Sequence, residues 1–170
     1  MGGTTDTIDL GRLGLSSGEG ASLTPLVAVD AVELGGQRYT ARGAVVDARL
    51  DVSHTTSGYA LRLRYGIRLE GPCMRCLESA SHELSVDARE VDQPGGGDDL
   101  RSPYLDADEL DVRSWARDAL VLALPVQIRC TAECRGLCGI CGANLNEDPE
   151  HAHQREPDPR WAKLSELKLD

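Results

Sequence analysis

Hydrophobic and polar residues alternate along the middle of the chain. In "YALRLRYGIRL", residues 59–69, apolar side chains recur at every second position, and arginines occupy three of the positions between them. A period of two is typical of a β-strand that buries one face and exposes the other to water. We therefore predict a strand here, with Arg62, Arg64 and Arg68 on its exposed face.

The neighbouring segments show the same alternation. The stretch "ARGAVVDARLDV", residues 41–52, has apolar residues at the even positions from 44 to 52. The positions between the last four of these carry Asp47, Arg49 and Asp51. The intervening "SHTTSG" ends at Gly58, which tolerates a positive φ, so the two segments form a hairpin. A third strand is predicted at "HELSVDAREV", residues 82–91, and a fourth at "LVAVDAVEL", residues 26–34. Together they predict a small antiparallel β-sheet.

The period changes near residue 111. The stretch 92–111 is rich in Gly, Pro and Asp and predicts an exposed loop. The following "DVRSWARDALVLALP" has Asp111 placed as an N-cap and Pro125 as the stop, which predicts a helix that covers the sheet. Its apolar positions at helical spacing are Val112, Trp115, Ala119, Leu122 and Ala123. A last helix is predicted at "DPRWAKLSELKL", residues 158–169, with Pro159 near its first turn.

These elements predict an α+β fold, with the antiparallel sheet covered by one or two helices. Residues 1–24 are rich in Gly, Ser and Thr and predict a flexible lead-in, while residues 25–170 form a single domain. The longest apolar segment, 119–126, is far below the roughly 20 residues of a membrane span, and the N-terminus lacks a charged start followed by an apolar run. We therefore expect a cytoplasmic protein with no membrane partner.

The charge balance bears on nucleic-acid binding. The formal net charge of −10 argues against it, because phosphate neutralisation supplies most of the affinity for RNA or DNA. Residues 37–75, however, carry seven arginines against three acidic residues. Side chains of like parity on a strand project to the same side, so they can follow a phosphate backbone as a row. The candidate RNA-binding residues are Arg49, Arg62, Arg64 and Arg68.

The cysteines are the strongest chemical signal. Four cysteines and two histidines fall in "CTAECRGLCGICGANLNEDPEHAH", residues 130–153, and the other two cysteines fall in "GPCMRCLE", residues 71–78. In a reducing cytosol, short-spaced cysteines are more often metal ligands than disulfides. The candidate ligands are Cys73, Cys76, Cys130, Cys134, Cys138, Cys141, His151 and His153.

The ligand count and spacing favour structural zinc. Two thiolates separated by two residues can face one Zn²⁺ ion from a tight knuckle, and Gly142 supports such a turn after Cys141. Eight ligands make two tetrahedral sites, so we expect one or two zinc ions and a zinc-knuckle segment at about 130–153. A closed four-ligand shell leaves no position for water or substrate, which favours a structural role over a catalytic one.

Other interpretations of these residues stay open. Cys130 or Cys134 as a free buried thiol, and His151 and His153 as solvated tail residues, are the simpler hypotheses. The spacing C-x3-C-x3-C-x2-C does not match the usual iron–sulfur patterns, and no helix-forming sequence follows Cys76 as a thioredoxin-like pair would need. No G-x-S-x-G setting and no phosphate-binding glycine loop is present. We therefore expect no enzymatic activity and no small-molecule substrate.

Four stretches together resemble a known family. The strand-borne "CMRCLE", the helix running into "LALP", the knuckle "CRGLCGICGANLNE" and the closing "DPRWAKLSEL" resemble the bacterial and plastid YceD family, the large ribosomal RNA subunit accumulation proteins. The resemblance covers roughly residues 25–168. It implies a role in accumulation of large-subunit ribosomal RNA, and hence in ribosome assembly, with no known reaction.

The resemblance also bears on the ligands. Related sequences often carry Cys-x-Cys where this chain has "HAH", which favours a ligand role for His151 and His153. Some relatives keep the first knuckle and the equivalents of Cys130 and Cys134 but lack the later one. This suggests that Cys73 and Cys76 share a site with Cys130 and Cys134.

Two kinds of partner agree with the sequence. The first is large-subunit ribosomal RNA or its precursor, contacted through the arginine row. The second is a basic ribosomal protein or a nuclease, bound by an acidic module that affects RNA levels without touching RNA. A net charge of −10 suits a basic partner.

Overall fold

The computed structural model of the chain describes residues 3–153. Antiparallel β-structure dominates, with one α-helix, in agreement with the expected α+β class. The strands are β1 Thr7–Asp9, β2 Gly20–Leu23, β3 Leu26–Ala28, β4 Val32–Leu34, β5 Gln37–Ala41, β6 Val45–Asp47, β7 Arg49–His54, β8 Tyr59–Pro72, β9 Ser79–Asp92, β10 Leu105–Asp106 and β11 Glu109–Asp111. The helix is α1 Val112–Ala123, and two 3₁₀ turns are η1 Gly11–Leu13 and η2 Asp98–Leu100.

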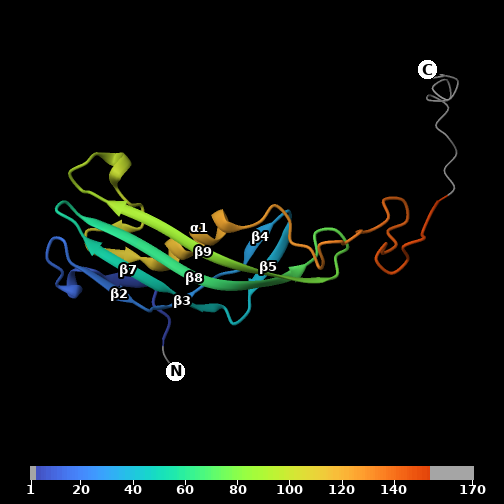
Figure 1. Cartoon of the computed structure of the whole chain (residues 1–170), viewed down its shortest axis with the longest axis horizontal. Helices are drawn as coiled ribbons and strands as arrows, with labels where there is room; N and C mark the ends of the chain where they lie inside the picture. The colour runs from blue at the N-terminus through green and yellow to red at the C-terminus, as the bar shows by residue number, and fades with distance from the viewer. Residues whose placement is uncertain (1–2, 154–170) are drawn as a thin grey trace, which may run out of the picture.

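The main sheet is built around β8. Five of its six strands run in the order β2-β7-β8-β5-β4, and the sixth, β9, pairs with β8 outside this path. β7 and β5 pair with the two ends of β8, whereas β9 pairs with it over its whole length, from Tyr59 opposite Asp92 to Pro72 opposite Ser79. Figure 1 shows β9, β8, β7 and β2 side by side, with α1 behind β9. Two smaller sheets, β1-β11-β10 and β3-β6, complete the fold.

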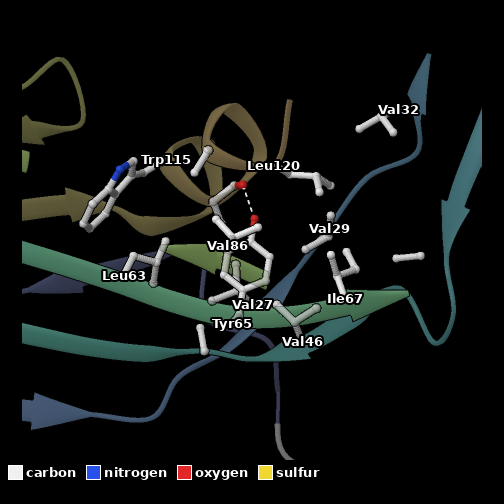
Figure 2. Close-up of a cluster of buried hydrophobic side chains, with 14 of the residues drawn as sticks. Val27, Val29, Val32, Val46, Leu63, Tyr65, Ile67, Val86, Trp115 and Leu120 are labelled. Carbon is white, nitrogen blue, oxygen red and sulfur yellow. Dashed lines mark hydrogen bonds between the residues drawn. The ribbon is translucent and has the colours of Figure 1, made fainter. Parts of the chain in front are cut away.

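The period-two prediction for residues 59–69 is confirmed. Leu61, Leu63, Tyr65, Ile67 and Leu69 are all buried, and the residues between them face away from the core. Alternation produces this result because successive strand side chains project to opposite faces of the sheet. Figure 2 shows the inward side chains of β8 meeting α1.

Helix α1 covers the inner face as expected. The Asp111 side chain accepts a hydrogen bond from the Ser114 backbone N–H at 2.9 Å, so it caps the helix. The Tyr65 hydroxyl on β8 donates to the Ala116 carbonyl, a bond drawn in Figure 2. The buried stripe is Val112, Trp115, Ala116, Ala119 and Leu120. The expectation for Leu122 is wrong: its side chain is 88% exposed.

The structure contains more strand than the sequence predicted. The expected flexible lead-in contributes β1 and β2, which pair with β11 and β7, and Leu10 between them is buried. Residues 26–34 form two short strands, β3 and β4, in different sheets, and β5 was not anticipated.

The stretch 92–111 is only partly a loop. It holds η2, β10 and β11, and it buries Leu105 and Leu110. Asp92, at the start of this stretch, is buried. Its carboxylate accepts a hydrogen bond from the Ser102 N–H at 3.0 Å and forms an ion pair with Arg101. The predicted helix at 158–169 lies outside the described residues.

A transmembrane helix would need a longer apolar run than any helix of residues 3–153 offers.

Candidate metal centres

The turn between β8 and β9 positions the first two cysteines. Cys73 begins this turn and Cys76 lies within it. The Cys73 N–H donates to the Glu78 carbonyl at 2.6 Å, and the Leu77 N–H donates to the Cys73 carbonyl at 3.0 Å. Leu77 has a φ of 65°, in the left-handed region. Gly142, which follows the second cysteine of the later knuckle, has a φ of 75°. Both C-x2-C turns therefore require the same backbone reversal after the second thiol.

The segment after α1 brings the next two cysteines to this turn. Ile128 is buried, and its carbonyl accepts a hydrogen bond from the Met74 N–H at 2.9 Å. This contact places Cys130 and Cys134 beside Cys73 and Cys76. Figure 1 shows the chain after α1 running to the end of the sheet where β8 and β9 turn.

The first cluster has the dimensions of a tetrahedral thiolate site. The Sγ atoms of Cys73 and Cys134 are 3.7 Å apart, those of Cys76 and Cys130 are 3.5 Å apart, and all four lie within 4.8 Å of one another. A tetrahedral ion with metal–sulfur bonds of about 2.3 Å separates its sulfurs by about 3.8 Å. Three of the four cysteines are buried. These residues can hold one metal ion.

Backbone and side-chain donors surround these sulfurs. Burial alone would raise the pKa of Cys73, but N–H groups of Cys76 and Arg75 directed at its sulfur lower it to about 6. Burial raises the pKa of Cys76 to about 12. Burial would likewise raise the pKa of Cys134, yet the Asn146 amide and the Gly136 N–H bring it below its ordinary value. A cation would stabilise four thiolates that otherwise repel one another.

The second cluster is more exposed. It joins Cys138, Cys141, His151 and His153, whose ligand atoms also lie within 4.8 Å of one another. The Cys141 Sγ is 3.1 Å from His151 Nε2 and 3.3 Å from His153 Nε2. Backbone N–H groups of Cys141 and Ile140 lower the pKa of Cys138 to about 6. Two thiols and two imidazoles can hold a second ion.

The candidate RNA-binding arginines share one face, but carboxylates accompany them. Arg62 donates twice to Asp87, at 2.8 and 2.6 Å, and Arg68 lies 3.5 Å from Glu83. Arg49 and Arg64 both pair with Asp51. Hydrogen bonds from Ser22 and then from these two arginines hold the pKa of Asp51 below its ordinary value.

The exposed face of β7, β8 and β9 is therefore nearly balanced in charge. It carries Arg49, Arg62, Arg64, Arg68 and Arg89 against Asp51, Glu70, Glu83 and Asp87. A phosphate backbone would have to displace carboxylates to reach these arginines.

Comparison with known protein families shows the family of this chain. The family model described as "Large ribosomal RNA subunit accumulation protein YceD" matches residues 61–168, more than half of the chain. The chain belongs to the YceD family. The matched stretch begins in β8 and includes both candidate metal clusters.

Known proteins match this YceD protein over different shares of its length. An uncharacterized protein of Mycobacterium tuberculosis is 30% identical over 178 residues, covering 95% of this chain and 80% of that protein. The Arabidopsis thaliana protein named "Large ribosomal RNA subunit accumulation protein YCED homolog 1, chloroplastic" is 32% identical over 60 residues, 35% of this chain and 19% of its own. No solved structure gives a significant match.

Two residues that contact the candidate metal clusters carried no recognisable sequence signal. The Asn146 amide lies 3.5 Å from Cys134 Sγ, and its carbonyl oxygen accepts a hydrogen bond from the Arg135 N–H at 2.7 Å. Arg75, inside the first knuckle, donates to the Cys134 and Arg135 carbonyls. Asn146 links the segment of the second cluster to Cys134, and Arg75 links the β8–β9 turn to the chain at Cys134 and Arg135.

Proposed function

We propose that this chain is a non-enzymatic ribosome-assembly factor that supports accumulation of large-subunit ribosomal RNA and is stabilised by two structural zinc ions. The RNA role is supported by the family match over residues 61–168, because the description of that family names accumulation of large-subunit ribosomal RNA. The two closed sets of four ligands support the structural role of the metal.

Zinc suits both donor sets. Four thiolates, or two thiolates with two imidazoles, are the ligand sets of structural zinc sites, and each fills a tetrahedral shell. Cys73, Cys76, Cys130 and Cys134 would hold one ion, and Cys138, Cys141, His151 and His153 the other. Bound zinc would crosslink the β8–β9 turn to the chain that follows α1.

We expect purified protein to contain two zinc ions and no iron per chain. Elemental analysis after gentle purification measures this directly, with thiol-blocked protein as the control for loosely bound metal. The double variant Cys138→Ser/His151→Ala should retain one ion, because the first cluster uses none of the altered residues. One ion or none in the parent would contradict the two-site assignment.

Depletion of this protein in its host should lower large-subunit ribosomal RNA relative to small-subunit ribosomal RNA. Quantifying both RNAs in a deletion strain, with and without the parent gene supplied in trans, checks this expectation. An unchanged ratio would argue against the proposed role, whatever the metal content of the protein.

Two modes of action fit the proposed role. In the first, Arg49, Arg62, Arg64 and Arg68 contact RNA phosphates directly. In the second, the chain is an acidic module that binds a basic ribosomal protein or a nuclease and does not touch RNA. The near-balanced charge of the sheet face favours the second mode, because each of these arginines already has a carboxylate neighbour.

Direct contact predicts a specific result for the triple variant Arg62→Gln/Arg64→Gln/Arg68→Gln. RNA binding should weaken across all sequences, and the slope of log K against log salt should fall by roughly 0.7 to 0.9 for each phosphate that is no longer neutralised. Titration with ribosomal RNA fragments over a salt series measures both quantities.

The control for this variant removes the same charge elsewhere, with Arg12, Arg117 and Arg129 replaced by Gln. All three control positions are exposed. If the sheet-face variant keeps the parent affinity and slope, or if the parent binds no RNA at low salt, direct contact is ruled out and the acidic-module mode is supported. Parallel titration with isolated basic ribosomal proteins then identifies the partner class.

A further inference from the structure

Strand β9 has a free edge. It pairs with β8 along all 14 of its residues, and no other strand of residues 3–153 pairs with it. Figure 1 shows it as the outermost strand of the sheet. Its register with β8 is unbroken, and residues 79–92 contain no proline. A long, regular edge without bulge or proline is a template for pairing with another strand.

The hydrogen-bonding direction of this edge follows from its neighbours. The Cys73 N–H donates to the Glu78 carbonyl, and this pair continues the β8–β9 register. Odd-numbered residues of β8 therefore hydrogen-bond to even-numbered residues of β9. The Thr55 N–H donates to the Gly58 carbonyl, so even residues of β8 bond toward β7. Odd residues of β9, from Ser81 to Val91, therefore direct their N–H and C=O groups outward.

A groove with an apolar wall runs beside this edge. It has a volume of about 440 Å³ and lies between residues 85–90 of β9 and the α1 side chains of Trp115, Ala119, Leu122 and Ala123. Leu122 is 88% exposed there. Covering this leucine when another strand pairs with β9 would remove apolar surface from water, which favours the pairing.

We propose that a second copy of this chain occupies the edge, through antiparallel β9–β9 pairing about a two-fold axis at Val86. In this register Glu83 lies opposite Arg89 of the second copy, and the same pair recurs on the other side of the axis. Ser85 lies opposite Asp87, and on the inner face His82 lies opposite Glu90. A two-fold interface is self-complementary in this way because each residue pair occurs twice.

Charge selects this register over its neighbours. Only registers that place odd residues opposite odd residues use the outward N–H and C=O groups. Moving the two-fold axis from Val86 to Asp87 places Asp87 opposite Asp87 of the second copy. Moving it to Ser85 places Glu83 opposite Asp87. Like charges directly opposite each other destabilise a strand pair, whereas opposite charges stabilise it. The Glu83 side chain is 79% exposed and Arg89 is also exposed, so both are accessible to a second copy.

Charge reversal tests the pairing residue by residue. Sedimentation equilibrium of the parent over a range of concentrations should show a reversible dimer. Glu83→Arg places two arginines opposite each other, and Arg89→Glu places two glutamates opposite each other. Each variant alone should raise the dimer dissociation constant by at least about tenfold. An equimolar mixture of the two should dimerise again, because every pair in the heterodimer is then complementary.

Arg49→Glu is the matched control, since it reverses an exposed arginine on the same face but on β7, which β8 separates from β9. It should leave dimerisation unchanged, and circular dichroism should show the same fold for all variants. A parent that stays monomeric overturns the proposal and leaves the groove to a different occupant. A dimer that neither reversal weakens, or a mixture that fails to recover, overturns it as well.

Discussion

The Cys73→Ser variant is expected to unfold at a much lower temperature than the parent, with a loss of unfolding free energy on the order of 3 kcal/mol or more. The His153→Ala variant should lose about 1 kcal/mol and keep the sheet folded. The difference arises from where the two clusters lie and from how much chain each one closes.

The first cluster joins distant parts of the chain. Its sulfur pairs link residues 61 and 54 positions apart, whereas the Cys141–His153 contact of the second cluster spans 12. Closing a longer loop removes more conformational entropy from the unfolded chain. Cys73 is also fully buried, so its replacement leaves three thiols without a complete shell, whereas His153 is exposed.

Thermal melts of both variants, each with its zinc content determined, measure this difference. Cys141→Ser provides a matched thiol-to-hydroxyl change in the second cluster and should resemble His153→Ala. Equal shifts for Cys73→Ser and His153→Ala would contradict the division of ligands between the two sites.

Trp115→Ala should be the most damaging core substitution in α1, with a loss of about 3 to 5 kcal/mol. The Trp115 side chain is 2% exposed and stacks on Tyr104 with ring centroids 6.3 Å apart. It fills the space between α1 and the inner face of the sheet, as Figure 2 shows, and alanine would leave a cavity there.

Leu122→Ala is the matched control for this helix. Because Leu122 is 88% exposed, its truncation should change stability by no more than about 0.5 kcal/mol. Denaturant unfolding of both variants, at a concentration low enough to avoid dimerisation, gives the comparison. A large loss for Leu122→Ala, equal to that for Trp115→Ala, would mean that the helix presents a different face to the sheet.

Local patterns predicted the elements that depend on neighbouring residues. The alternation in residues 59–69 identified β8 and its buried face, because strand geometry forces successive side chains to opposite sides. Asp111 and Pro125 predicted the two ends of α1. The Asp111 side chain accepts a hydrogen bond at the start of the helix and Pro125 lacks a backbone N–H, and both effects act within one helical turn. The short cysteine spacings identified the candidate ligands for the same local reason.

Contacts between distant residues were decided only by the tertiary structure. Nothing near residues 7–23 signals β1 and β2, because their partners lie on β11 and β7 and the pairing is between backbones. The run 119–124 is apolar on every side, so periodicity could not distinguish Leu120, which is buried, from Leu122, which is exposed. Alternation likewise placed the arginines on one face but could not show that Asp51 and Asp87 on adjacent strands pair with them. Strand register, which brings such residues together, is determined by how the whole sheet packs and not by any single segment.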